Sequence, residues 1–182
     1  MSLILTLTPD HGYLLIALGL IAFECLVVGF VVAGAARGKV FNKQFMETNF
    51  GDLHFQHFKE PINTQGYPDM GTGRYAEKLS YNDWVHFNNA QRAHYNFVEQ
   101  IGSILALLAI GGIVYPVPAA IFGFIFFVAR FFYCWYASAQ GAKHPLRRVG
   151  ALLGDVALLG AFVLTIMTAV KVLGSTEEAI TA

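Results

Sequence analysis

Four long apolar stretches restrict this chain to a fold that buries them in a membrane. They cover residues 12–36, 101–117, 118–137 and 149–170, and their charged residues are Glu24, Arg130 and Asp155. A helix needs about 20 apolar residues to cross the hydrocarbon core. Backbone groups in lipid must find hydrogen-bond partners within the protein, which helices provide. The sequence therefore predicts an all-α, integral membrane four-helix bundle.

The second stretch is short for a membrane helix, so we expect its helix to extend back through polar residues to about Tyr81. A connection at about residues 37–80 precedes it and is rich in turn-forming residues. Five phenylalanines in this connection indicate that it packs on some other surface and does not extend freely into solvent: Phe41, Phe45, Phe50, Phe55 and Phe58. A connection of this length usually carries function or hidden structure. We expect a single domain over residues 1–182.

The formal net charge is zero, so the chain has no overall field that would attract nucleic acid. Basic residues gather instead in two connections. Arg37, Lys39, Lys43, Lys59, Arg74 and Lys78 lie between the first and second stretches, and Lys143, Arg147 and Arg148 lie between the third and fourth. Cytoplasmic loops of membrane proteins carry an excess of Lys and Arg. This distribution predicts that both connections face the cytosol and that both termini lie on the opposite side.

A polar face precedes the second apolar stretch. Arg92, Asn96 and Glu99 stand at i, i+4 and i+7, so on a helix they share one side. Charged groups near hydrocarbon usually face a cavity, a partner or the bundle interior. A cation, an amide and a carboxylate in a row suit a small ligand that carries both carboxylates and an ammonium group.

Further polar residues stand near the predicted cytosolic ends of the helices: Arg37, His94, Arg130, Tyr133, Arg147 and Arg148. Together they predict an arginine-rich pocket that is open to the cytosol. Structural roles remain as alternatives. Arg92 and Glu99 would form an ion pair, Arg130 would pair with Glu24 or Glu99, Tyr133 would belong to an interfacial aromatic belt, and Arg147 and Arg148 would reach the headgroups or pair with Asp155. His94 has no Cys or His partner at ligand spacing, so no metal site is expected.

Several runs of residues resemble the MAPEG family, the membrane-associated proteins of eicosanoid and glutathione metabolism. The run from Arg92 to Glu99 is similar to the family's helix-two motif Arg-Ala-His/Gln-x-Asn-x-x-Glu. Residues 36–40, 130–133 and 143–147 resemble its basic end of helix one, its helix-three Arg-x-x-Tyr/His and the start of helix four. The resemblance covers roughly residues 10–173. Residues 88–94 and 130–133 look most like the microsomal glutathione transferase type 3 branch.

The resemblance implies a homotrimer in the endoplasmic reticulum or a related membrane, with glutathione bound between subunits and facing the cytosol. By match, Arg92, Asn96 and Glu99 would hold glutathione and Tyr133 would contact it, with His94, Arg130 and Arg37 as further candidates. Arg147 would stabilise the thiolate, with Arg148 as its rival. The chain departs from the pattern at three positions: Gln100 replaces an aromatic residue, Ala137 replaces a tyrosine that Tyr136 misses by one place, and Gly38 replaces a second arginine.

The expected chemistry follows from the properties of a thiol. A free thiol has a pKa of about 8.5, and a guanidinium in a partly desolvated pocket favours the thiolate. The thiolate would attack a lipophilic electrophile or reduce a lipid hydroperoxide, with glutathione as cosubstrate. The sequence thus predicts a membrane-bound glutathione transferase or peroxidase. The alternative is a non-catalytic lipid-binding scaffold of the same fold, which would not require a thiolate site.

Overall fold

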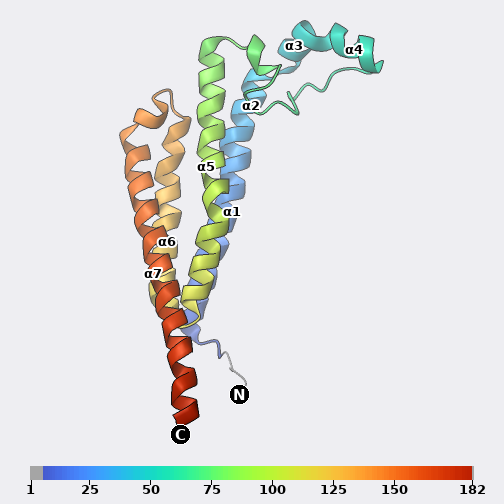
Figure 1. Ribbon diagram of the computed structural model, residues 1–182. Coiled ribbons are helices and arrows are strands. Elements are labelled where there is room, and N and C mark those ends of the chain that lie inside the picture. Colours follow the sequence, from blue (N-terminus) through green and yellow to red (C-terminus); the bar gives the residue numbers. More distant parts are fainter. Residues whose placement is uncertain (1–5, 182) are drawn as a thin grey trace. The chain divides into compact units, whose positions relative to one another are not determined.

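The computed structural model of the protein describes residues 6–181, with side chains through residue 174. All regular elements of this part are helical (Figure 1). They are α1 (Pro9–Val27), the π-helical segment η1 (Val28–Gly34), α2 (Ala35–Val40), α3 (Lys43–Met46), the π-helical η2 (Glu47–Gly51), α4 (Asp52–Phe58), η3 (Ala76–Lys78), α5 (Tyr81–Gly112), α6 (Pro116–Tyr133), η4 (Cys134–Ala137), η5 (Gly141–Lys143) and α7 (Pro145–Thr181). The predicted all-α class is confirmed.

Four helices in the described residues are long and apolar enough to cross a membrane. They are Pro9–Val40, Tyr81–Gly112, Pro116–Ala137 and Pro145–Gly174. The chain is thus an integral membrane protein with several crossings. The second helix begins at Tyr81, as the sequence predicted. The first continues to Val40, so part of the segment expected as a loop is helical.

Local sequence signals set where these helices begin. Pro9, Pro116 and Pro145 each occupy the first position of a helix. The N–H at this position has no partner within the helix, so proline, which lacks an N–H, costs no hydrogen bond there. The start of α5 is capped by Ser80. Its Oγ accepts a hydrogen bond from the Asp83 N–H at 3.1 Å and donates to Asp83 Oδ2 at 2.8 Å. These contacts satisfy one of the free donors of the first turn of α5.

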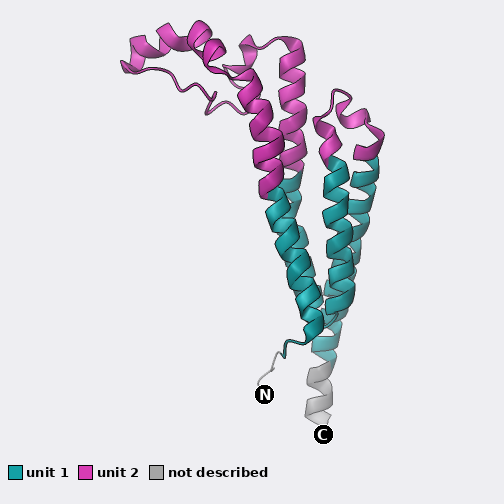
Figure 2. Cartoon of the chain, turned by 180° about the vertical axis from the view of Figure 1, so that it is seen from behind, with its two compact units in different colours: residues 1–25, 97–133, 148–182 teal, residues 26–96, 134–147 magenta. Residues whose placement is uncertain are grey.

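The chain divides into two compact units (Figure 2). Unit 1 comprises Met1–Cys25, Phe97–Tyr133 and Arg148–Ala182, and unit 2 comprises Leu26–Asn96 and Cys134–Arg147. The single domain over residues 1–182 stays a prediction.

Glycines allow the helices of unit 1 to approach closely. At Gly150 on α7, an added Cβ would lie 2.5 Å from the Tyr133 nitrogen and 2.6 Å from the Ala129 oxygen, which belong to the backbone of α6. Threonines add hydrogen bonds between helices. The Thr165 hydroxyl donates to the Leu107 carbonyl of α5 at 2.9 Å. Small residues and interhelical hydrogen bonds of this kind hold membrane helices together, because lipid supplies no hydrophobic drive for their association.

Unit 2 has an apolar core that joins the connecting segment to α5. Phe41 and Phe87 are both buried and meet edge to face, with ring centroids 5.2 Å apart. Phe50 is buried in the same cluster, and Phe45 packs against it. The prediction that the connection packs on another surface is confirmed for these residues. Phe55 and Phe58 are exposed on α4, so for them it stays a prediction.

Replacing Gly150 with Ala should destabilise the protein by about 1–3 kcal/mol, because the new methyl group meets backbone atoms that cannot rotate away. Gly102→Ala is the matched control. Gly102 lies within α5 with nothing within 4 Å of an added Cβ, so this change should be neutral or slightly stabilising. Thermal unfolding of the detergent-solubilised protein measures both. Equal melting temperatures for the two variants would contradict the close contact of α6 and α7.

Candidate functional site

Unit 2 contains a hollow of about 430 Å³ beside the first half of α5. Ten residues from three segments line it: Met70, Thr72, Trp84, Val85, Asn88, Asn89, Gln91, Arg92, Tyr95 and Tyr136. Its volume falls in the range of small-molecule sites, which is about 300–1,000 Å³. Of the predicted ligand-binding face, Arg92 lines the hollow, whereas Asn96 and Glu99 are not among its lining residues, so the predicted site stays a prediction.

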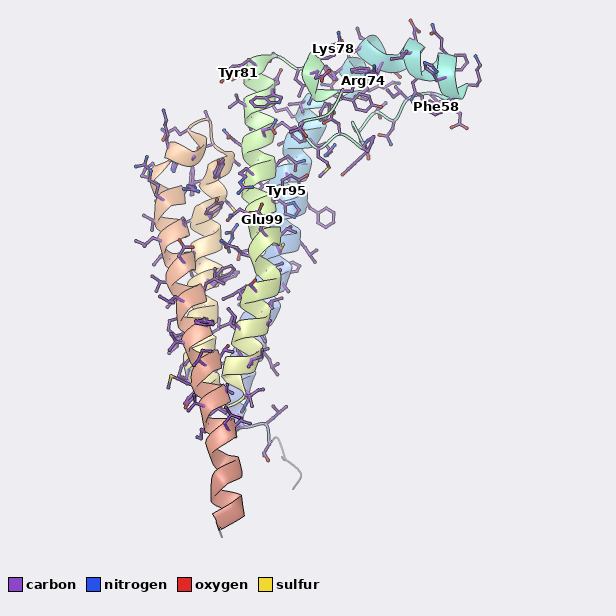
Figure 3. The ribbon with its side chains drawn as sticks, in the orientation of Figure 1. Phe58, Arg74, Lys78, Tyr81, Tyr95 and Glu99 are labelled. Carbon is purple, nitrogen blue, oxygen red and sulfur yellow. The ribbon has the colours of Figure 1, made fainter. Side chains whose placement is uncertain are left out.

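Helical periodicity in α5 aligns the lining residues. Val85, Asn89 and Arg92 follow at spacings of four and three, so they form one stripe along the helix. Asn96 and Glu99 continue this stripe toward the apolar half of α5. Arg92 and Glu99 are exposed on the chain, and Asn96 is half-buried. Figure 3 labels Tyr95 and Glu99 on the same helix, one turn apart.

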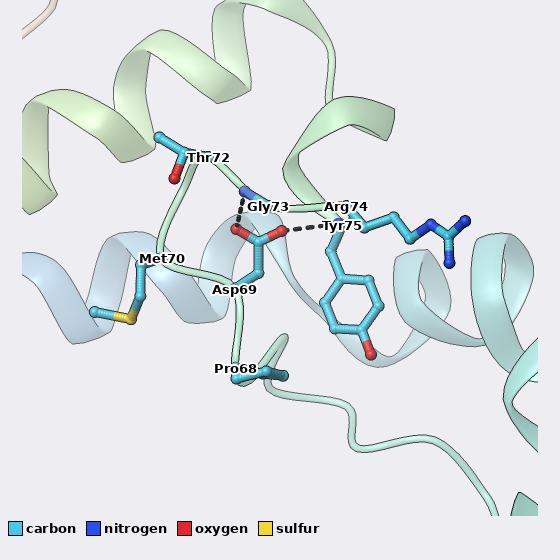
Figure 4. Close-up of a pocket in the computed structure, with 7 residues that line it drawn as sticks. All are labelled: Pro68, Asp69, Met70, Thr72, Gly73, Arg74 and Tyr75. Atoms are coloured by element: carbon cyan, nitrogen blue, oxygen red, sulfur yellow. Dashed lines mark hydrogen bonds between the residues drawn. The ribbon is translucent and has the colours of Figure 1, made fainter.

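Met70 and Thr72 of the lining come from residues 66–76, which we call the Asp69 loop. Asp69 is only 6% exposed, and its carboxylate accepts four backbone hydrogen bonds. Oδ1 accepts from the N–H groups of Gly71 (2.7 Å) and Gly73 (3.0 Å), and Oδ2 accepts from those of Tyr75 and Ala76 (both 2.8 Å). Figure 4 shows the bonds from Gly73 and Tyr75. In this segment one carboxylate thereby accepts backbone hydrogen bonds that a helix or sheet would otherwise accept.

These hydrogen bonds also decide the ionisation of Asp69. Burial acts to raise the pKa of the carboxyl, but the four backbone N–H groups favour the charged form and together hold the pKa below its ordinary value of 3.8. The carboxylate is therefore ionised throughout the neutral range. Gly71, with φ of 105°, takes a conformation that a residue with a side chain rarely adopts, and this allows the loop to turn around the carboxylate.

Three side chains of α5 fasten the Asp69 loop to the helix. The Trp84 Nε1 and the Asn88 Nδ2 each donate to the Gly71 carbonyl at 3.0 Å. Gln91 Nε2 donates to the Met70 carbonyl at 3.4 Å, and Gln91 is itself buried. The backbone of residues 70 and 71 is thus hydrogen-bonded to the start of α5.

Arg147 and Arg148 differ in their surroundings. Arg147 is half-buried in the first turn of α7, and its guanidinium carbon lies 5.3 Å from the ring centroid of Tyr136, which lines the hollow. Arg148 is exposed. Arginine often stacks on aromatic rings in this way, and the contact fixes the direction of its charge.

Arg37 packs against the Asp69 loop. It is 5% exposed, and its guanidinium carbon lies 4.2 Å from the Tyr67 ring centroid and 5.2 Å from that of Phe87. Its Nη2 also contacts the sulfur of Met70 at 3.2 Å. This arginine therefore packs against the loop and forms hydrogen bonds with it. Its assignment to glutathione stays a prediction.

His94 is half-buried against the π-helical segment η1. An added Cβ on Gly29 would lie 2.9 Å from the imidazole Nε2, so a larger residue here would require the ring to shift. π-helical turns within α-helices are frequent at functional sites. Here the turn coincides with the place where a polar side chain of α5 meets the first membrane helix.

The predicted helix-three residues lie together in unit 1. Arg130 is 3% exposed, and its guanidinium carbon lies 4.4 Å from the Tyr133 ring centroid and 4.5 Å from that of Phe97. Its Nη1 donates to Gln100 Oε1 at 3.2 Å. Glu24, one of the partners considered from sequence, is within electrostatic range of Arg130.

Sequence reasoning did not foresee several of these residues. Gln100 looked only like a departure from a family pattern, yet it accepts a hydrogen bond from a buried arginine. Tyr136 looked misplaced by one residue, yet it lies between Arg147 and the hollow. Asp69 was not identified at all. The turn-rich run around it, with glycines at 66, 71 and 73, was the available signal that a loop here needs a side chain to organise its backbone.

The arrangement can hold an anionic, hydrogen-bonding molecule. Arg92 supplies a charge at the wall of the hollow, and the Arg147 guanidinium carbon lies 5.3 Å from the ring of Tyr136, which also lines it. The side-chain nitrogens of Asn88, Asn89 and Gln91 already donate to the carbonyls of Gly71, Ser138 and Met70, so these amides shape the wall of the hollow.

Comparison with known protein families identifies the chain. Residues 14–167 match the model of the MAPEG family, which is most of the 182 residues. No solved structure matches the chain. The chain therefore belongs to the MAPEG family, and the family predicted from the residue runs is confirmed.

Replacing Asp69 with Ala should loosen the Asp69 loop, because four backbone N–H groups lose their acceptor at a cost of more than about 2 kcal/mol. Trypsin should then cleave faster after Arg74 and Lys78, which lie in and next to the loop (Figure 3). The control is Asp52→Ala at the exposed start of α4. Equal cleavage rates in both variants would contradict the role of Asp69.

The pH dependence of the loop has a definite sign. Because the folded pKa of Asp69 lies below its ordinary value, the carboxylate contributes its full stabilisation above pH 3.8. That stabilisation is lost as the pH falls from 3.8 through the lowered pKa. Hydrogen exchange of the Gly73 and Tyr75 amides should therefore keep its protection down to about pH 4 and lose it below. Protection that declines between pH 6 and 5 would point to another group.

Proposed function

We propose that this MAPEG protein is a membrane-bound glutathione transferase that also reduces lipid hydroperoxides with glutathione. Family membership supports glutathione as the cosubstrate. The observation that carries the proposal is the hollow of unit 2, where Arg92 lines the wall and Arg147 stacks against Tyr136 of the same wall. One guanidinium in the wall of the hollow and a second beside a tyrosine of that wall suit a ligand with carboxylates and a thiolate. The runs at 88–94 and 130–133 favour the type 3 branch of the microsomal transferases.

In this proposal α5 binds the peptide part of glutathione. Arg92 pairs with a carboxylate, Asn96 bonds a backbone amide, and Glu99 accepts from the ammonium group. Tyr133 and Arg130 contact the ligand from α6, and His94 and Arg37 complete the set. The stripe at i, i+4 and i+7 on one helix supports this division of roles.

Arg147 stabilises the thiolate. A guanidinium keeps its charge when partly buried, and each unit by which it lowers the thiol pKa corresponds to about 1.4 kcal/mol. Arg147 also stands in the first turn of α7, where the helix dipole favours a negative charge. Its half-burial and its contact with Tyr136 favour it over the exposed Arg148.

Two reactions follow from a stabilised thiolate. In conjugation the thiol proton leaves to solvent, the sulfur forms a bond to the electrophilic carbon, and the leaving group departs with its electron pair. In peroxide reduction the sulfur attacks the terminal peroxide oxygen and the O–O bond breaks. The sulfur becomes a sulfenic acid, and the departing alkoxide takes a proton from solvent to give the alcohol. A second glutathione thiol then converts the sulfenic acid to disulfide and water.

We further propose a homotrimer with its site facing the cytosol, in the endoplasmic reticulum or a related membrane. Arg92 and Glu99 are exposed on a membrane-length helix, and charged groups in such positions usually face a cavity or another subunit. The basic residues of the two connections support a cytosolic placement. Native mass spectrometry tests the trimer, and cysteine labelling from outside sealed microsomes tests the orientation.

Replacing Glu99 with Gln should weaken glutathione binding by about 1–3 kcal/mol, because the ammonium group loses a charged acceptor. Isothermal calorimetry on the purified, folded protein measures this. Glu77→Gln, in η3, is a control carboxylate outside the proposed set. Unchanged affinity in Glu99→Gln would remove Glu99 from the site.

Replacing Arg147 with Ala should raise the pKa of bound glutathione by at least about one unit and lower kcat for a chloronitrobenzene about tenfold or more. The far-ultraviolet absorbance of the thiolate, titrated against pH, reports the pKa directly. Arg148→Ala is the matched control and should change neither quantity. The reverse result would transfer the role to Arg148. If neither variant changes the pKa or the turnover, the lipid-binding scaffold becomes the better description.

A further inference from the structure

We propose that the helical segment Lys43–Phe58, which we call the arm, docks on the phospholipid surface of the membrane that the chain itself spans. The arm comprises α3, η2 and α4, which follow one another without a break. Within unit 2 it turns away from α2 (Figure 1). The sequence predicted a packing surface for Phe55 and Phe58, and the lipid surface supplies one. The inference does not depend on the glutathione chemistry proposed above.

The two ends of the arm have different surroundings. Met46 and Phe50 are buried in the core of unit 2, so the arm is fixed to its own unit. Further along, three large apolar side chains are exposed: Leu53 by 44%, Phe55 by 55% and Phe58 by 66%. Phe55 and Phe58 stand at i and i+3 on α4 and are therefore neighbours on its surface. A group of large apolar side chains left exposed in this way indicates an interaction surface.

The membrane is the occupant because the arm is attached to it. The first membrane helix ends at Val40, and the arm begins at Lys43. That helix has 32 residues, which at 1.5 Å per residue extend over about 48 Å. A bilayer with its headgroups is about 40–45 Å thick, so a helix of this length brings its end close to the headgroup layer. A tethered segment meets such a surface at high effective concentration, whereas a soluble partner must first diffuse to it.

Unit 2 also contains surface that lipid covers. The turn η1 belongs to the first membrane helix, and Phe30 and Val31 on it are exposed in the chain. In a membrane-spanning helix such side chains face hydrocarbon or another membrane helix. The arm follows this helix directly and belongs to the same unit. Docking of the arm therefore extends a membrane contact that unit 2 already makes.

The polar groups beside the exposed apolar residues suit a phosphate. A pocket of about 170 Å³, which we call the α4 pocket, is lined by residues that include Leu53, His54, His57, Phe58 and Arg74. None of the described residues that line it is acidic. The Arg74 guanidinium can pair with phosphate oxygens, and imidazole N–H groups can donate hydrogen bonds to them. Apolar side chains that insert, next to basic groups that reach the phosphates, are typical of helices that lie on a membrane surface.

Tryptophan fluorescence with brominated lipid tests the docking in the full-length protein. Phe58→Trp adds an indole at the exposed end of α4. Gln56→Trp is the matched control, because two residues along a helix place it on nearly the opposite side. Each variant is reconstituted in nanodiscs of phosphatidylglycerol and phosphatidylcholine brominated in its acyl chains, and the wild-type fluorescence is subtracted. Bromine should quench the added fluorescence strongly in Phe58→Trp and weakly in Gln56→Trp, and aqueous acrylamide should show the reverse order.

Two results would overturn the docking. If acrylamide quenches both variants equally and bromine quenches neither, the arm lies in water. If the added emission of Phe58→Trp is blue-shifted and neither reagent quenches it, the arm contacts protein, such as a second copy of the chain. Both substituted residues are exposed, so neither change removes a core contact that folding requires.

A further variant tests the phosphate contact. Arg74→Gln, combined with Phe58→Trp, should reduce the quenching by bromine, because α4 loses a charged contact with the headgroups. Lys78→Gln is the matched control, since Lys78 is also basic and exposed but is not among the residues that line the α4 pocket. If both changes reduce the quenching equally, or neither does, Arg74 has no specific phosphate contact and this part of the proposal is wrong.

Discussion

Lipid hydrocarbon is the constraint on which the rest of this structure depends. It offers no partner to a polar backbone group, so each of the four apolar stretches must be helical. Lipid also provides no hydrophobic driving force for helix association, so close packing contacts must hold the helices together. At Gly150 the backbone of α7 lies directly against the backbone of α6. Polar chemistry is then restricted to helix ends, to cavities and to the connecting segments.

Unit 2 shows how a connecting segment becomes part of a site. The Asp69 loop has little regular structure, yet one buried carboxylate satisfies four of its backbone N–H groups. Trp84, Asn88 and Gln91 then fasten it to α5. Because these bonds lie next to the hollow, the same contacts that order the loop also shape the proposed binding wall. The order of the loop and the shape of the hollow therefore depend on the same few residues.

The arginines illustrate how one residue type serves different ends. Arg37 and Arg130 are buried among aromatic rings, where ring contacts and hydrogen bonds accommodate their charge. Arg147 is half-buried on one tyrosine, and Arg92 and Arg148 are exposed. A buried guanidinium organises its neighbours, whereas a partly exposed one at a hollow remains accessible to a ligand. This difference is the physical basis for proposing Arg147 for the thiolate.

The sequence by itself determined the membrane class, the helical fold, the start of α5 at Tyr81 and the family, because apolar length and helical spacing are properties of local sequence. It also placed Arg92, Asn96 and Glu99 on one helix. Only the tertiary structure decided that Tyr136 lies beside Arg147, that Gln100 accepts from Arg130 and that Asp69 organises a loop forming one wall of a hollow. These contacts join segments distant in sequence, or depend on backbone turns that residue types alone do not specify, so no local periodicity encodes them.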